Sequence, residues 1–293
     1  MNFSHWQSIT RLIDEKTGHR PQGFHSTALS GGDISRAWRL SDGQKTYFVK
    51  TNHRDRLSMF EAEQIGLEEI KRSQTIRVPE VYGCDIEGDQ SFILMEYIEL
   101  GGDIQPELLA QHLAAMHLVT QLQFGFSIDN TIGSTPQINQ LTLNWVEFWQ
   151  KHRLGFQLDL AKKNQLDKEM IDRGEKLSGV VGHFFSDYQP AASLLHGDLW
   201  RGNQSAERQG NPVIFDPACY YGDHEAELAM MELFGHPGQD FFSIYAEIFP
   251  LNNGYAVRRD LYNLYHILNH ANMFGAGYSS SARRLIDKLL AQA

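Results

Sequence analysis

Residues 194–223 contain the side chains whose types and spacing best suit chemistry. Two short apolar runs in this stretch are each followed by polar residues, Asp198 and Asn203 after the first and Asp216 after the second. Two carboxylates and an amide oxygen suit a hard cation such as Mg²⁺. In phosphoryl transfer one Asp takes or orients the hydroxyl proton, while an Asn and a second Asp hold the metal on the nucleotide phosphates. We therefore expect Asp198 to be the base, and Asn203 and Asp216 to be metal ligands.

A second His-x-Asp triplet, from His53 to Asp55, has the letters of the protein-kinase HRD motif. No Asn follows Asp55 at the fifth position, whereas Asn203 follows Asp198 at that spacing. The triplet also stands early in the chain, directly after a predicted strand, where no catalytic loop belongs. We interpret it as a surface turn. For Asp198 itself, the alternative is a capping residue in a tight turn.

Three strands are predicted near the N-terminus, at residues 24–29, 35–40 and 45–51, because they are separated by Gly-containing turns that suit hairpins. Gly31 and Gly32 lie in the first turn. Their backbone N–H groups could approach a phosphate, although the sequence is neither G-x-G-x-x-G nor a Walker A loop. A plain hairpin turn is the alternative.

Lys50 lies on the inward face of the third predicted strand, where a lysine needs a carboxylate partner. Ser58 and Glu61 have the spacing of a capping box that begins a helix. Glu63 falls on the apolar face of that helix. A strand Lys paired with an inward helix Glu orients nucleotide phosphates in kinase folds. We expect this pair, and the alternative is a stray surface Lys and Glu.

A Gly-containing break, IELGGD, follows two further predicted strands. We place the lobe boundary there, which gives an N-terminal lobe of residues 1–98 and a mostly helical lobe of residues 99–293. The length of 293 residues also favours two lobes. Backbone near Glu96 and Ile98 could pair with adenine.

The second lobe is expected to be mostly helical, with a long ordered loop at residues 124–143 and an apolar strand, the predicted metal strand, that ends in Asp216. The predicted helices of the whole chain, besides the one that Ser58 begins, cover residues 3–16, 106–119, 143–161, 166–185, 223–235, 238–248, 256–275 and 279–291.

The net charge is −10 and no basic block is present, which disfavours nucleic acid and anionic membranes as partners. The N-terminus has no signal-peptide pattern, and no apolar run approaches the length that spans a bilayer. Cys84 and Cys219 follow no zinc or disulfide spacing. A reducing cytoplasm is the expected location.

The order of these elements resembles the protein-kinase-like fold of small-molecule kinases. The amino-acid sequences of several segments resemble those of the fructosamine kinase (ketosamine-3-kinase) family, and the resemblance covers nearly the whole chain. The segments are HGDLWRGN, IFDPACYYGDHEAELAM, FGFSIDNTIGSTPQIN, WVEFWQKHRLGFQLDLA and LNHANMFGAGY. The resemblance implies an α+β fold with two lobes: an antiparallel five-stranded sheet plus helix in the N-lobe, and a mostly helical C-lobe.

The resemblance also implies an activity: ATP-dependent phosphorylation of a ketoamine at its 3-hydroxyl, with Mg²⁺, as a deglycation step. Lys50 and Glu63 would orient ATP, and the roles of Asp198, Asn203 and Asp216 would be those given above. Trp200 would be a stacking wall for the ketosugar, with a buried core aromatic as the alternative.

Three residues near the C-terminus, Asn269, His270 and Asn272, could line the acceptor site on the resemblance alone. Many relatives carry a Cys in the Gly-rich turn where this chain has Asp33. Regulation through a thiol is therefore not expected.

Two other functions compete with this interpretation. A kinase for another small alcohol, such as an aminoglycoside or choline, is disfavoured by Trp200 and by the segment 135–137. A catalytically inactive kinase-like binding module should lack one of the key residues, and none is missing.

Three acidic residues, Asp223, Glu225 and Glu227, follow the predicted metal strand. We expect them to be structural, either anchoring the catalytic loop or capping the next helix, rather than to contact substrate.

Overall fold

The computed structural model describes residues 3, 6–30, 34–235, 237–275 and 277–293. The chain divides into two compact units. The first is Met1–Ile104 with Ser205–Asp216, and the second is Gln105–Gln204 with Pro217–Ala293. The first unit therefore includes residues 205–216, which the sequence analysis placed in the second lobe.

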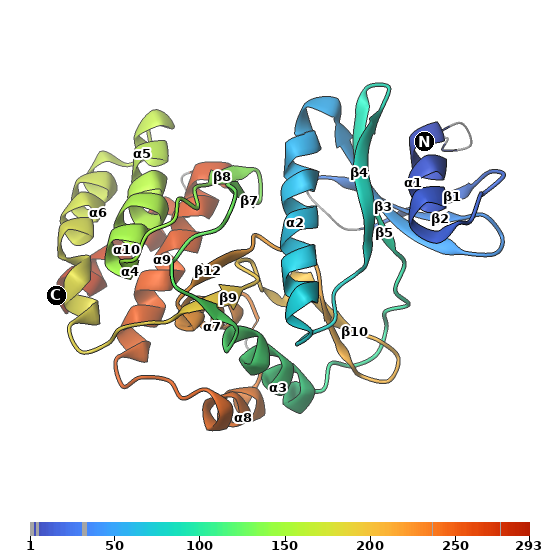
Figure 1. Ribbon diagram of the computed structural model, residues 1–293. Coiled ribbons are helices and arrows are strands. Elements are labelled where there is room, and N and C mark those ends of the chain that lie inside the picture. The colour runs from blue at the N-terminus through green and yellow to red at the C-terminus, as the bar shows by residue number, and fades with distance from the viewer. Residues whose placement is uncertain (1–2, 4–5, 31–33, 236, 276) are drawn as a thin grey trace. The chain divides into compact units, whose positions relative to one another are not determined.

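An antiparallel five-stranded sheet forms the centre of the first unit (Figure 1), as expected, with the strand order β1-β2-β3-β5-β4. In β3 buried residues alternate with more exposed ones, whereas the five middle residues of β5 are all buried. The strands are β1 (His25–Leu29), β2 (Arg36–Ser41), β3 (Thr46–His53), β4 (Val81–Glu87) and β5 (Gln90–Glu96).

Helices α1 (Gln7–Thr17) and α2 (Leu57–Ser73) cover the two faces of this sheet (Figure 1). On the α1 side, Ile9 and Ile13 are fully buried against strand residues such as Val49. On the α2 side, buried apolar residues at helical spacing face the sheet.

The predicted capping box at the start of α2 is wrong. The helix begins at Leu57, and Ser58 and Glu61 lie inside its first turns with no side-chain cap. The 3₁₀ turn Arg54–Arg56 runs directly into the helix, so the capping position is taken by Arg56.

The hairpin of β10 (Gln204–Ala206) and β11 (Pro212–Ile214) brings residues 205–216 to the first unit. Ile214 N–H donates to the Arg77 carbonyl at 3.0 Å. Gly101 N–H donates to the Ala206 carbonyl at 3.1 Å. Asp216 follows β11, so these bonds fix its place in the first unit.

The second unit is built mainly from helices (Figure 1). None of the helices in the described part of the chain is both long enough and apolar enough to cross a membrane. The helices are α3 (Pro106–His117), α4 (Trp145–Phe148), α5 (Phe156–Lys163), α6 (Lys168–Val180), α7 (His224–Leu233), α8 (Gln239–Ile248), α9 (Tyr255–Phe274) and α10 (Ser279–Leu290).

Short strands complete the second unit. β9 (Ala192–Leu195) is the central strand between β6 (Thr120–Gln121) and β12 (Tyr220–Gly222). The stretch expected to be a loop, 124–143, contains the hairpin of β7 (Asn130–Ile132) and β8 (Thr135–Gln137). The three-residue length of each strand explains why the alternation signal was missed.

The single helix predicted at residues 143–161 is interrupted. A π-helical segment, Trp149–Gly155, separates α4 from α5. The wider π turn carries Trp149 and Arg153 into the core, where both are almost fully buried. Around them, Trp145, Phe148 and Tyr262 form ring contacts.

Candidate active site

Lys50 on β3 contacts two carboxylates within the first unit. Its Nζ donates to Glu63 Oε1 of α2 at 2.6 Å, and it also bonds to Asp216 Oδ1. The side chains of Lys50 and Glu63 are 12% and 11% exposed. The structure therefore forms the pair expected from the sequence and adds Asp216 to it.

This group of one ammonium and two carboxylates carries an excess negative charge. Burial disfavours the charge on Lys50, but the carboxylates of Asp216 and Glu63 outweigh it and raise the pKa of the lysine. Burial raises the pKa of Glu63, and the charge of Asp216 adds to this rise although Lys50 opposes it. A cation bound beside Asp216 would therefore be electrostatically favoured.

Asp216 is held in an uncommon backbone conformation, with φ +61°. Non-glycine residues adopt this left-handed region rarely, and such outliers occur often at functional sites. Its side chain is 41% exposed, in contrast to the buried Lys50. The carboxylate thus remains accessible to a ligand while one oxygen holds the lysine.

Asp198 and Asn203 meet in the loop between β9 and β10, within the second unit. Asn203 Nδ2 donates to the Asp198 carbonyl at 2.8 Å and to Asp198 Oδ2 at 3.1 Å. The 3₁₀ turn Arg201–Asn203 returns the chain so that these side chains meet. Since the amide nitrogen faces Asp198, the amide oxygen of Asn203 is the atom suited to a cation.

Asp216 and Asn203 each offer an oxygen of the kind that Mg²⁺ prefers, one from each unit, and neither residue alone could hold the ion without further ligands. No group of three or more His, Cys, Asp or Glu in the described residues could hold a metal ion. Mg²⁺ is commonly held by one or two protein carboxylates together with substrate phosphates and water. The chemistry of Asp216 and Asn203 is consistent with a metal that arrives with a nucleotide.

Glu227 of α7 anchors the loop between β9 and β10, which carries Asp198. Its carboxylate accepts hydrogen bonds from the backbone N–H of His196 at 2.8 Å and of Gly197 at 2.7 Å. His117 Nε2 lies 3.2 Å from the same carboxylate. Burial alone would raise the pKa of Glu227, but hydrogen bonds from His117 and His196 lower it. The structural role expected for Glu227, that of anchoring this loop, is confirmed.

Asp223 caps α7, because its Oδ1 accepts a hydrogen bond from Glu225 N–H at 3.0 Å. Tyr188 and Tyr262 also donate to its carboxylate. Burial and the charge of Glu225 raise the pKa of Asp223 to about 7. Glu225 forms a buried ion pair with Arg258 at 2.6 Å. Both carboxylates have structural partners, as expected.

Trp200 is not a core residue, since its side chain is 41% exposed. Its ring lies over Gly202, where an added Cβ would be 2.3 Å from the indole. A larger residue at position 202 would therefore displace the tryptophan. The alternative of a buried aromatic is wrong, and an exposed ring two residues after Asp198 in the chain is available to a ligand.

The backbone near Glu96 and Ile98, predicted to pair with adenine, already makes some hydrogen bonds within the protein. Glu96 N–H donates to the Glu80 carbonyl at 2.8 Å, and its carboxylate pairs with Arg77 at 2.5 Å. Ile98 N–H has no backbone acceptor among the described residues. Of the two positions, Ile98 is therefore the one with a donor to offer.

Gly31 and Gly32, together with Asp33, lie outside the described residues. The HRD-like triplet is exposed, as expected: His53 ends β3, and Arg54 and Asp55 lie in the 3₁₀ turn that follows. Neither Cys84 nor Cys219 forms a disulfide in the described part of the chain. Burial and nearby carboxylates raise the pKa of the Cys84 thiol, and Cys219 is buried, so neither has the character of a reactive thiolate.

The asparagines proposed near the acceptor have other partners. Asn269 Oδ1 accepts from Gln157 Nε2 at 3.2 Å, and Asn272 Nδ2 donates to Gln157 Oε1 at 2.8 Å. These bonds join α9 to α5. His270 packs among aromatic rings, including Phe234 at 4.9 Å.

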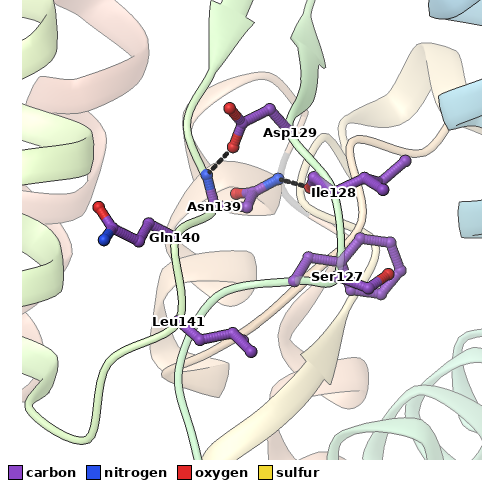
Figure 2. Close-up of a pocket in the computed structure, with 7 residues that line it drawn as sticks. Ser127, Ile128, Asp129, Asn139, Gln140 and Leu141 are labelled. Carbon is purple, nitrogen blue, oxygen red and sulfur yellow. Dashed lines mark hydrogen bonds between the residues drawn. The ribbon is translucent and has the colours of Figure 1, made fainter.

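A hollow of about 420 Å³ lies in the second unit, and most of its lining belongs to the segment FGFSIDNTIGSTPQIN (Figure 2). Figure 2 shows Asp129 Oδ1 accepting a hydrogen bond from Asn139 N–H at 2.7 Å, and Asn139 Nδ2 donating to the Ile128 carbonyl at 3.1 Å. Two polar residues of the lining, Asp129 and Asn139, are thus already bonded to each other. Its lining comprises residues 126–129 and 139–141.

A family model and individual relatives of known sequence agree on the family to which the chain is similar. The sequence model of the fructosamine kinase family matches residues 5–292. A chloroplastic protein-ribulosamine 3-kinase of Oryza sativa subsp. japonica is 46% identical over 270 residues, which are 90% of this chain and 78% of the relative. A provisionally named ketoamine kinase of Synechocystis sp. is 42% identical over 291 residues, 97% of each chain.

Solved structures agree with the sequence comparison. A provisionally named fructosamine-3-kinase from Haemophilus somnus 129PT matches with a TM-score of 0.89 at 31% identity, covering 98% of both chains. A thermostable variant of aminoglycoside phosphotransferase APH(4)-Ia, in complex with AMP-PNP and hygromycin B, matches with a TM-score of 0.61 at 17% identity. This match covers 97% of this chain and 98% of the other. The second likeness shows the shared kinase-like fold.

Proposed function

The chain belongs to the fructosamine kinase family, and from that membership we propose that it phosphorylates the 3-hydroxyl of a ketoamine of the fructosamine or ribulosamine type, with ATP as the phosphoryl donor. It is a transferase that acts on a hydroxyl group. The acceptor would be a free ketoamine or a glycated lysine on a protein. Residues 1–98 would form the nucleotide-binding lobe and residues 99–293 the catalytic and substrate lobe.

The observation that carries this proposal is the contact of Lys50 with both Glu63 and Asp216. Kinase folds use such a pair of Lys and Glu to orient the nucleotide phosphates. Glu63 fixes the lysine, and the lysine supplies a positive charge to phosphate oxygens. The Ile98 N–H would donate to the adenine ring, beside the carbonyl of Glu96, and Gly31 and Gly32 would lie near the phosphates.

Asp198 would accept the proton of the ketoamine 3-hydroxyl as that oxygen attacks phosphorus. Asn203 supports this role because its amide N–H bonds to Asp198 Oδ2 and restrains the carboxylate. Glu227 holds the backbone immediately before the base. The base is therefore positioned before the acceptor arrives, which lowers the cost of reaching the reactive geometry.

Asp216 and Asn203 are the residues that would hold Mg²⁺. A bound Mg²⁺ would neutralise charge on the phosphates during transfer. Asp216 is accessible and belongs to a group with excess negative charge, so a cation there is electrostatically favoured.

The exposed ring of Trp200 would pack against the sugar carbons of the acceptor. A phosphate at C3 lies on the carbon next to the C2 carbonyl. Once the ketoamine forms its 1,2-enaminol, the nitrogen lone pair can expel this phosphate from C3, and water then hydrolyses the imine left at C1. The amine is then released without a second enzyme, and the reaction would serve deglycation. Free thiols at Cys84 and Cys219 are consistent with a cytoplasmic location.

The test is ADP release with fructosyl-lysine, ribulosyl-lysine, a glycated protein, free ketoses, an aminoglycoside and choline as acceptors. Ketoamines should be preferred over every other acceptor, and phosphorus NMR should place the phosphate on the 3-hydroxyl. Preference for the aminoglycoside or choline would replace the ketoamine with another small alcohol. No ADP release with any acceptor, despite Mg·ATP binding, would favour an inactive binding module.

A further inference from the structure

Four buried polar side chains of the second unit form a connected set, the amide cluster, which the proposed reaction does not use. Gln137 Nε2 and Asn139 Nδ2 both donate to Asn130 Oδ1, at 2.9 Å and 3.0 Å. Arg153 Nη2 donates to Asn139 Oδ1 at 2.8 Å. The exposed fractions of the four residues range from 0% to 8%. The cluster thus joins the β7–β8 hairpin to the π-helical segment.

Arg153 is a fully buried cation, and in the described part of the chain no carboxylate forms an ion pair with it. Its guanidinium donates to the Ile138 carbonyl at 2.7 Å and lies over the rings of Tyr220 and Phe148, at 4.2 Å and 4.6 Å from their centroids. Burying a charge without a counter-ion is costly. π-helical segments also occur often at functional sites. The buried charge and the π-helical backbone both indicate that the position of the Arg153 side chain has a role beyond packing.

The amide cluster holds two backbone carbonyls of the segment that directly follows Asp216. Asn130 Nδ2 donates to the Cys219 carbonyl at 2.8 Å, and Gln137 Nε2 donates to the Ala218 carbonyl at 3.0 Å. The bonded residues are 89 and 81 positions apart in the sequence. The segment therefore depends on the hairpin for its position.

Ala218 in turn contacts the catalytic loop. Its N–H donates to the His196 carbonyl at 2.9 Å. Gly197 lies so close to the Ala218 carbonyl that a Cβ on the glycine would be 2.1 Å from this oxygen, and its φ of +83° also favours glycine. A shift of Ala218 would therefore shift the backbone that carries Asp198.

We propose that the amide cluster positions the catalytic loop: Gln137 and Asn130 fix Ala218 and Cys219, and Ala218 fixes the backbone that leads to Asp198. Arg153 holds the cluster in place through Asn139. The proposal rests on the proposed role of Asp198 as base. Misplacing a reacting group by about 1 Å can cost roughly 100-fold in rate, so loss of the cluster should lower kcat.

The main test is Gln137→Met in the full-length protein, because methionine keeps the length of the side chain and removes its amide. The kcat with a ketoamine should fall by roughly 10–100-fold. The KM for ATP should change by less than about twofold, because the substitution alters no proposed contact with ATP. Hydrogen exchange of the Ala218 amide should accelerate in the native protein.

The matched control is Gln150→Met. Gln150 Nε2 also donates to a backbone carbonyl of the second unit, that of Ser178 at 2.6 Å, but it has no bond to the amide cluster or the catalytic loop. This variant can lose stability, yet its kcat and the exchange of the Ala218 amide should equal those of the wild type. A milder second variant is Tyr265→Phe, which removes only the hydroxyl that donates to Gln137 Oε1 at 2.8 Å. It should lower kcat and accelerate exchange of the Ala218 amide as Gln137→Met does, but by smaller factors.

A folded Gln137→Met protein with wild-type kcat, or with unchanged exchange at Ala218, would overturn the proposal. If Gln137→Met does not fold, Tyr265→Phe decides by the same two measurements. The exchange measurement needs no substrate. Failure of the proposed function, seen as a wild type that phosphorylates no ketoamine, is therefore distinguishable from failure of the positioning role.

Discussion

The carboxylate of Glu227 lies 2.7 Å from the backbone N–H of Gly197, so a buried charge on α7 fixes the residue immediately before Asp198. Glu227→Gln should lower kcat by roughly 10–100-fold, because an amide can accept only one of the two backbone hydrogen bonds in the same way. Steady-state kinetics and thermal unfolding measured together will separate a kinetic effect from lost stability.

Glu232→Gln is the control for this variant. Glu232 lies on the same helix and pairs with Arg259 at 2.9 Å, without a contact to the catalytic loop. Its kcat should match the wild type. Equal kcat in Glu227→Gln and Glu232→Gln would remove Glu227 from the positioning of Asp198.

Asp198→Asn should lower turnover by about 10²–10⁴-fold, the usual contribution of a general base. Binding of Mg·ATP should persist, because Asp198 contacts the acceptor in the proposed mechanism. The control is Asp55→Asn in the HRD-like turn, whose side chain is 77% exposed. Near-normal turnover of Asp198→Asn, or an equal loss in Asp55→Asn, would contradict the assignment.

Asp216→Ala should lose affinity for Mg·ATP and activity together, because it removes the carboxylate proposed as the main charged metal ligand. Nucleotide titration with and without Mg²⁺ measures the effect. Asp85→Ala, which removes a surface carboxylate paired with Arg11, should leave both unchanged. Activity of Asp216→Ala with the usual Mg²⁺ dependence would show that the metal is held elsewhere.

Trp200→Ala should raise the acceptor KM, or lower kcat/KM, by one to two orders of magnitude. The estimate follows from about 1–3 kcal/mol for an aromatic contact, with roughly 1.4 kcal/mol per factor of ten. The KM for ATP and the melting temperature should change little, since the ring is 41% exposed. A collapse of ATP affinity instead would place the ring on the nucleotide side of the transferred phosphate.

His224 makes stability depend on pH. Burial, together with the nearby charges of His117 and Arg258, lowers its pKa to about 3. Between the usual pKa near 6.5 and this value, the unfolded chain binds the proton and the folded one does not, so this residue's contribution to stability falls as pH decreases. Urea unfolding of His224→Gln should show a pH slope smaller than that of the wild type by about 1.4 kcal/mol per pH unit between roughly pH 4 and 6. Identical slopes would contradict the shift.

The elements that local patterns specify could be predicted from the sequence. Runs separated by turns predicted the strands of the first unit, the family resemblance implied that five of them form an antiparallel sheet, and helical spacing placed Glu63 on the face that meets Lys50. The capping box failed because a 3₁₀ turn took over the start of α2, a choice set by the preceding chain.

Other features depend on distant residues and carry no local signal. Nothing in the sequence separates a π-helical segment at Trp149–Gly155 from an ordinary helix. The bond from Gln137 to the Ala218 carbonyl spans 81 positions, and its significance appears only when the two segments meet in the fold. The return of residues 205–216 to the first unit was also not predicted, since it depends on bonds to Arg77, Gly101 and Gly102.

The first unit is discontinuous in sequence, and this has a consequence for synthesis on the ribosome. The sheet strands, Lys50 and Glu63 are all translated before residue 105, so a neutral pair of lysine and glutamate can form early. Asp216 emerges only after the whole of 105–204. Chains are made at about 5–20 residues per second, so the nascent first unit passes through seconds in which the carboxylate proposed to bind metal does not yet exist.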